Sequence, residues 1–194
     1  TKVYEIPQGT RVSKGRAVHN FLELPSEEKI SAIINYSSEG IDKEKSLFMA
    51  TEKGVVKKTT LKDFANIRRT GIIAISLKEK DALKWVTLAG KGDEVIMVTK
   101  GGKSIRFKES DTRAMGRSAA GVKGISLKGG DIVSSFDIIK GDDKVEFLVV
   151  TENGYGKRTL LSQYKVQRRG GSGIITAKVT SKTGGVVSSH VIID

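Results

Sequence analysis

The sequence repeats itself with a period of about fifty residues, and this repeat restricts the fold more than any other feature. Three segments align, each with an apolar run, a threonine, a glycine three positions later and then a basic stretch. They are LFMATEKGVVKKTTL from Leu47, VIMVTKGGKSIRFKE from Val95 and FLVVTENGYGKRTLL from Phe147. A period of this length is typical of arrays in which each repeat is one supersecondary unit packed on its neighbours.

Each aligned segment has the chemistry of a β-hairpin. The runs LFMAT, VIMVT and FLVVT are rich in residues that favour strands. The pair Asn153-Gly154 is a strong signal for a two-residue turn with positive φ. Turns are therefore predicted near Gly154 and near the equivalent residues Gly54 and Gly102.

The second half of each unit repeats as well. IIAISL, VKGISL and IITAKV precede the longer runs ALKWVTLA, IVSSFDII and VVSSHVII, which alternate or stay apolar as strands do. The units span 47–93, 94–145 and 146–194, and each is expected to form a four-stranded antiparallel sheet. Residues 14–36 look like the second half of a further, truncated unit within 1–46.

Such units predict an all-β, propeller-like disc of about four blades, forming one domain over 1–194. Helix is expected only as short turns near 61–67 and 108–114. A β-sandwich with accidental similarity between its hairpins is the alternative fold. Because the chain starts in what looks like half a strand, we expect it to be a fragment of something longer.

Composition restricts the function classes. The formal net charge is +12, from 34 basic and 22 acidic side chains. This predicts a polyanionic partner, because neutralising phosphates releases condensed counterions. There is no cysteine, which fits a cytosolic protein. No apolar run reaches the roughly 18 residues of a membrane span, and no signal peptide is recognisable.

The charge gathers at one phase of the repeat. Residues 53–71, 101–124 and 153–173 carry net charges of +5, +4 and +5, whereas the rest of the chain is slightly acidic. Equal phase in a radial array means equal radius, so a belt along one rim is predicted. Candidate phosphate contacts in this belt are Lys57, Lys58, Arg68, Arg69, Lys103, Arg106, Arg113, Arg117, Lys123, Lys157, Arg158, Arg168 and Arg169.

The type of polyanion follows from the lack of stacking platforms. Single-strand binders need exposed aromatic side chains, and no basic stretch here interleaves them. Trp85 lies in an apolar strand, where core packing is expected. Contact with the backbone of a duplex is therefore favoured over base stacking.

A glycine-arginine loop stands out at 167–173, which reads QRRGGSG. Arginines can fork onto phosphate oxygens, and glycine amides can approach them without obstruction. Taken alone, the loop could equally be a basic turn between strands. The residues assigned to it as candidate DNA contacts are Gln167, Arg168, Arg169, Gly170, Gly171, Ser172 and Gly173.

QRRGGSG resembles the gyrase-A box, Q-[KR]-R-G-G-[KR]-G, of the C-terminal domain of DNA gyrase A subunits. The stretches DTRAMGRSAAGVKGISL, FMATEKGVVKKT, TENGYGKRT and KVYEIPQGTRVSKGRAVHNFLEL resemble the same family, so the resemblance covers nearly the whole chain. Two departures stand out. Ser172 replaces the basic residue at the sixth position, and the loop lies in a later blade than the usual box.

The resemblance implies a β-pinwheel, a disc of blades that exchange strands, which wraps duplex DNA around its basic rim. It implies partnership with the rest of gyrase A and with gyrase B, in the bacterial cytoplasm at the nucleoid, and a monomeric isolated domain. ATP and Mg²⁺ would be used elsewhere in the enzyme, and negative supercoiling would be the activity of the whole.

No catalytic, metal or nucleotide site is expected within the chain. His19 and His190 lack companions at metal-ligand spacing, and no phosphate-binding loop of the Gly-x-x-x-x-Gly-Lys-Ser/Thr type occurs. Two alternatives stay open. One is the C-terminal domain of topoisomerase IV, and the other is a propeller-like module that binds proteins through a disc face.

Overall fold

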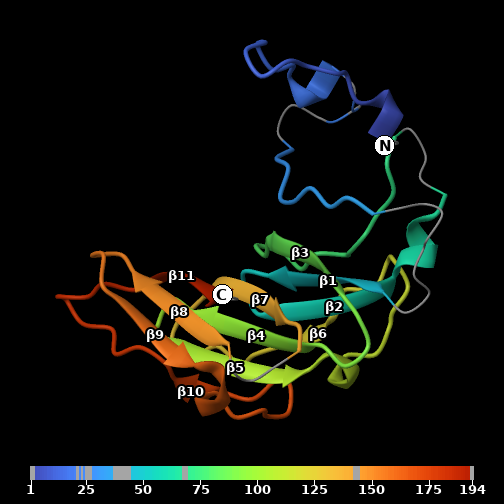
Figure 1. The fold of residues 1–194 in the computed structure, drawn as a ribbon. Helices are drawn as coiled ribbons and strands as arrows, with labels where there is room; N and C mark the ends of the chain where they lie inside the picture. Colours follow the sequence, from blue (N-terminus) through green and yellow to red (C-terminus); the bar gives the residue numbers. More distant parts are fainter. Residues whose placement is uncertain are drawn as a thin grey trace.

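The fold is a computed structural model that describes residues 3–20, 22, 24, 28–36, 45–66, 70–141 and 145–192. Regular structure in these residues consists of strands and short 3-10 turns (Figure 1). The predicted all-β class is therefore confirmed. The expected helical turns are found as η3 (Leu61–Phe64) and η4 (Glu109–Asp111).

The three aligned segments fold as antiparallel hairpins, as predicted. They are β1 (Ser46–Thr51) with β2 (Val55–Thr60), β4 (Glu94–Thr99) with β5 (Lys103–Lys108), and β8 (Glu146–Thr151) with β9 (Gly156–Leu160). Their turns contain Gly54, Gly102 and Gly154, with φ of 79°, 80° and 80°. A side chain would be strained in this left-handed region.

On one side, each hairpin pairs with the long strand of its own unit, which is β3 (Leu83–Ala89), β7 (Val133–Ile139) or β11 (Val186–Ile192). On the other side of the first two hairpins lies a short strand from the following unit. β6 (Val122–Lys123) pairs with β2, and β10 (Ile174–Ile175) pairs with β5. The sheet orders are β3-β1-β2-β6, β10-β5-β4-β7 and β11-β8-β9.

The expectation that each unit supplies all four strands of its own sheet is thus wrong, and the exchange implied by the resemblance is confirmed. The reason is the course of the chain after each hairpin. After η4 the chain runs parallel to β2, with a bridge between Lys58 and Ala114. After η5 (Leu161–Gln163) it runs parallel to β5, with a bridge between Arg106 and Val166. The second and third units therefore each deliver a strand to the preceding sheet.

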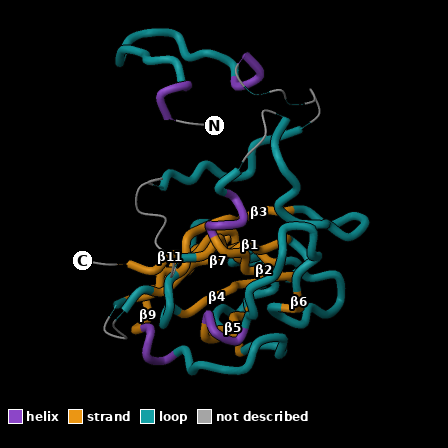
Figure 2. The backbone as a smooth tube through the Cα atoms, turned by 90° about the vertical axis from the view of Figure 1, so that its right-hand side faces the viewer, coloured by secondary structure: helices purple, strands orange, loops and turns teal. Residues whose placement is uncertain are grey.

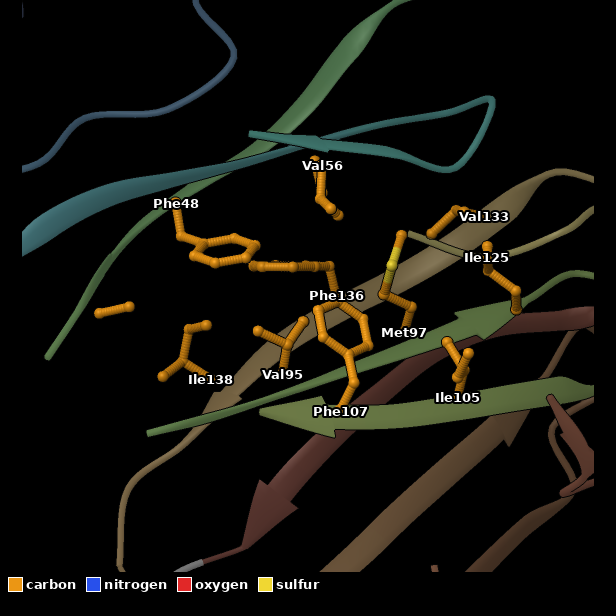
Figure 3. Close-up of a cluster of buried hydrophobic side chains, with 12 residues drawn as sticks. Phe48, Val56, Val95, Met97, Ile105, Phe107, Ile125, Val133, Phe136 and Ile138 are labelled. Carbon is orange, nitrogen blue, oxygen red and sulfur yellow. The ribbon is translucent and has the colours of Figure 1, made fainter. Parts of the chain in front are cut away.

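Two hydrophobic cores lie between the three sheets. The first contains Phe48, Val56, Val95, Met97, Ile105, Phe107, Ile125, Val133, Phe136 and Ile138 (Figure 3). The second contains Ile96, Val98, Ile139, Phe147, Val149, Leu161, Tyr164 and Val186. Neighbouring residues of β4 thus face different cores, so the strand is buried on both faces. Double burial explains its unbroken apolar sequence.

The exchanged segments and the long strands contribute to these cores. Ile125, just after β6, is only 2% exposed and packs in the first core, although it belongs to the second unit. Trp85 of β3 packs against the same core, as expected from the sequence. Phe48 and Phe136 stack with ring centroids 5.9 Å apart. Side chains from two units therefore meet in each core.

The N-terminal segment does not join a sheet within the described residues. Its first part, residues 3–20, has two 3-10 turns, η1 (Val3–Glu5) and η2 (Val18–Asn20), and lies apart from the sheets (Figures 1 and 2). Ser31 and Ala32 line a surface hollow together with Trp85 of β3. The described part of 14–36 therefore lacks the strands that its resemblance to a half-unit predicts, and it makes no ladder contact with a neighbouring hairpin.

The exchange makes a stability prediction. Replacing Ile125 by alanine should lower the free energy of unfolding by about 2–5 kcal/mol, because it empties a buried site between two units. Ile175 in β10 is 77% exposed, so Ile175→Ala is the matched control and should change stability by less than about 0.5 kcal/mol. Urea unfolding of both variants measures this. Equal stabilities would contradict the exchange of buried side chains between units.

Candidate nucleic-acid interface

The basic side chains assigned to the rim divide into buried and exposed groups. Lys57 and Arg106 are 0% and 5% exposed, and the Lys58 side chain is 13% exposed. Lys103 and Arg117 are half-buried. The exposed members are Arg113, Lys123, Lys157, Arg158 and Arg168. Arg68 and Arg69 lie outside the described residues.

Lys57 is buried at the junction of the first two units. Its Nζ donates a hydrogen bond of 2.7 Å to the Ala74 carbonyl and another to the Arg117 carbonyl. Burial lowers the pKa of this ammonium, and the nearby Asp63 carboxylate partly opposes the shift. This position does not support its prediction as a phosphate contact, because its donors are turned inward onto backbone carbonyls.

One position of the repeat is occupied by Lys58, Arg106 and Arg158, and each forms an ion pair. Lys58 binds Glu109 at 2.6 Å, which lies in the next unit. Arg158 binds Glu146 at the base of its own hairpin. Charge counting along the repeat cannot reveal such pairs, because the partners are separated in sequence.

Arg106 has partners in both the second and the third unit. It binds Glu94 at 2.5 Å and donates to the carbonyls of Leu161 at 3.1 Å and Tyr164 at 3.2 Å. A buried charge is stable only when it is paired and hydrogen-bonded. These contacts do not support the assignment of Arg106 as a direct DNA contact, since its guanidinium joins the second and third units.

The loop 167–173 lies against the second sheet. The Gln167 amide donates to the Arg106 carbonyl at 2.7 Å. A Cβ atom at Gly173, where φ is 70°, would overlap the Ser104 carbonyl oxygen. Only glycine fits there, because the two backbones come so close. Arg168 and Ser172 are exposed, whereas Arg169 is half-buried.

Lys157 and Arg158 lie in β9, whereas the other three exposed cations lie on the segments that cross between units. Arg113 precedes the parallel bridge to β2, Lys123 lies in β6, and Arg168 precedes β10. Their side chains make no hydrogen bond or ion pair with the residues that the structure describes. Solvated guanidinium and ammonium groups at such positions can bind phosphate oxygens.

An ion pair that sequence reasoning missed links the second and third hairpin turns. Lys100 Nζ lies 2.8 Å from Glu152, whose other contact is the Gly185 amide at 2.8 Å. The hydrogen bond from Lys100, and then that from Gly185, lower the pKa of Glu152, while the same carboxylate raises the pKa of Lys100. Both side chains are exposed by about half, so the pair orients the turns more than it stabilises them.

Metal and membrane chemistry find no support in the described part of the chain. It contains no group of three His, Asp or Glu residues able to hold a metal ion. No helix there is long and apolar enough to cross a membrane. His190 lies in β11, as expected, and shares a hydrogen bond of 2.8 Å with Ser188.

Sheets joined by exchanged strands, with solvated cations on the crossing segments, define a propeller-type domain. The family model for the DNA gyrase C-terminal domain, beta-propeller, matches residues 45–89, 93–140 and 146–192. The chain belongs to this family.

Relatives agree with this assignment. The DNA gyrase A protein of Staphylococcus epidermidis is 44% identical over 96% of the chain, and that of Salmonella typhimurium is 43% identical over all of it. The chain spans 21% and 22% of their lengths. A solved C-terminal domain of DNA topoisomerase IV superposes with a TM-score of 0.89 at 27% identity, covering 99% of this chain and 59% of that one. A solved DNA gyrase A C-terminal domain gives 0.79 at 28%, covering 93% and 59%.

Lys57 generates a prediction that separates structure from DNA contact. Lys57→Met keeps the length of the side chain but leaves two carbonyls without their donor, so stability should fall by about 1–3 kcal/mol. Affinity for a short duplex should not change at urea concentrations below those that unfold the protein. Urea unfolding and fluorescence anisotropy measure the two quantities. Weaker duplex binding at unchanged stability would restore Lys57 to the DNA contacts.

Proposed function

We propose that this chain is a non-catalytic module that binds and wraps duplex DNA for a bacterial DNA gyrase. The observation that carries the proposal is the set of solvated cations on the crossing segments, with Arg113, Lys123 and Arg168 as its central members. The other candidate members are Lys103, Arg117, Lys157 and Arg158, of which Arg158 is paired with Glu146. Because each crossing segment is fixed to the preceding sheet, the cations of successive units form a continuous track.

Duplex DNA is the polyanion that this track suits best. Its phosphates are regularly spaced, and contacts to them need no base recognition. The described exposed apolar residues include few aromatics, namely Tyr4 and Tyr155. Tyr155 has Lys182 over its ring at 5.6 Å, which occupies one face. A platform for stacking successive single-stranded bases is not supported.

The wider assembly follows from the family. In the whole enzyme the module would act beside the remainder of gyrase A and with gyrase B, which would hydrolyse ATP with Mg²⁺ to drive negative supercoiling. The blade repeats would be 47–93, 94–145 and 146–194, with outer strands exchanged between neighbours. The module itself would be monomeric, without cofactor, and cytoplasmic at the nucleoid.

The C-terminal domain of topoisomerase IV is the second candidate, because a solved example has a TM-score of 0.89. Gyrase is favoured by sequence identities of 43–44% to gyrase A proteins over nearly the whole chain. A supercoiling assay on the parent enzyme with and without this module tests the choice. Relaxation without supercoiling by the intact parent would favour topoisomerase IV.

Binding through phosphates predicts a steep response to salt. The logarithm of the association constant should fall linearly with the logarithm of salt concentration, with a slope of about −0.9 for each phosphate neutralised. Affinity should hardly depend on base sequence. Anisotropy titrations on two unrelated duplexes measure both quantities. A flat salt response would instead support a module that binds proteins through a disc face.

Wrapping, as distinct from binding, predicts unequal effects on long and short DNA. Bending 20–30 base pairs by 40–90° costs on the order of 1–6 kcal/mol, which contacts on several blades must offset. Arg113→Gln with Lys123→Gln should therefore reduce bending of a long duplex more than affinity for a short one. End-to-end fluorescence transfer and anisotropy provide the two measurements.

The matched control is Lys91→Gln with Lys140→Gln. It removes the same charge from two exposed lysines outside the three basic stretches. This control should leave bending nearly unchanged. If the control reduces bending as much as Arg113→Gln with Lys123→Gln does, the loss of net charge explains the effect and the position of the cations does not.

A further inference from the structure

The two arginines of the loop 167–173 have different surroundings. Arg168 is exposed, and its side chain makes no hydrogen bond or ion pair within the described residues. Arg169 is folded back onto the second unit. Its Nε donates to the Asp111 carbonyl at 3.3 Å, and one terminal nitrogen donates to the Lys123 carbonyl at 2.5 Å. A planar guanidinium can serve two such acceptors at once.

Backbone bonds beside Arg169 bind the same two units. The Gly170 amide donates to the Gly124 carbonyl at 2.7 Å, and the Ser126 amide donates to the Gly171 carbonyl at 2.8 Å. Gly170 has a φ of 84°, and a Cβ added there would lie 3.4 Å from the Lys123 carbonyl oxygen. The loop is therefore hydrogen-bonded to the segment 123–126, which contains Lys123.

The preceding junction uses a cation in the opposite direction. There Lys57 of β2 donates to the Arg117 carbonyl of the following unit. At the position of β5 equivalent to Lys57 the chain has Ile105, which is fully buried and cannot donate. Ile105 Cδ1 lies 3.6 Å from a Cβ placed on Gly171. The neighbouring Arg106 of β5 donates to the carbonyls of Leu161 and Tyr164. The carbonyls of Asp111 and Lys123 in the crossing segment take their side-chain donor from the loop, as Arg169.

We propose that Arg169 is a positioning residue that holds Lys123 and its segment on the DNA track, and that Arg168 is the arginine of this loop that contacts phosphate. The role of each arginine on DNA rests on the proposed function. Two adjacent arginines of one motif are thereby divided between an internal contact and an external one.

The first test does not involve DNA. Hydrogen exchange of the Ser126 and Gly170 amides should accelerate about tenfold in Arg169→Lys, because the lysine ammonium is a compact point charge on a shorter side chain and lacks the planar fork that spans the Asp111 and Lys123 carbonyls. Arg168→Lys should leave the exchange of these amides unchanged. The Val98 amide in the second core is an internal reference. If Val98 accelerates equally, Arg169 stabilises the whole fold and the positioning role is wrong.

The second test separates charge from geometry on DNA. Arg168→Gln should make the salt slope for a short duplex shallower by about 0.9, and Arg168→Lys should restore it. Arg169→Lys keeps the charge, so the slope should stay, but bending of a long duplex should fall. The opposite result has two parts: Arg169→Lys bends long DNA as the unmodified chain does, and Arg169→Gln makes the salt slope shallower by about 0.9. That result would make Arg169 a direct phosphate contact.

The third test asks whether Arg169 acts through Lys123. In the background of Lys123→Gln, the further change Arg169→Lys should have little additional effect on bending, whereas Arg168→Gln should add its full effect. Additivity of Arg169→Lys with Lys123→Gln would overturn the proposal. If the unmodified chain shows no salt-dependent duplex binding, the proposed function fails instead, and the hydrogen-exchange result still decides the role of Arg169.

Discussion

The exchange of outer strands between units is the constraint on which the rest of this structure depends. A hairpin such as β1-β2 leaves one edge of backbone donors and acceptors open, and an open edge invites unspecific pairing. Here the following unit covers it. Gly124 and Ile125 donate to the Gly54 carbonyl, and Thr176 and Ala177 donate to the Gly102 carbonyl. No sheet with such a strand is complete without its neighbour, so the units fold as an array.

Charge is used at two levels because burial changes what a cation can do. Inside, an ammonium or guanidinium must be paired, since an unpaired buried charge is very unfavourable. Lys57 and Arg106 meet this need with carbonyls and a carboxylate from other segments. Outside, Arg113 and Lys123 stay hydrated and can exchange water and counterions for phosphate. The buried cations hold the crossing segments in place. The exposed cations on those segments are thereby positioned to bind phosphate.

Some of the fold and of the site could be predicted from the sequence by local chemistry. Turn glycines and double-sided apolar runs place the hairpins, because positive φ and burial on both faces each leave a local pattern. The strands with which VKGISL and IITAKV pair cannot be predicted from local sequence. These segments read as strands of their own unit, yet they pair with the preceding one. Their short ladders give no signal that identifies the partner strand.

The sequence by itself determined the repeat, the all-β class, the cationic phase of each unit and, through its motifs, the family resemblance. Only the tertiary structure decided which cations face solvent. Lys57 and Lys58 are neighbours in a basic strand, but one is buried against carbonyls and the other pairs with Glu109. Arg168 and Arg169 differ in the same way. The reason is physical: charge is a property of a residue, whereas hydration and pairing depend on residues that the fold brings from other units.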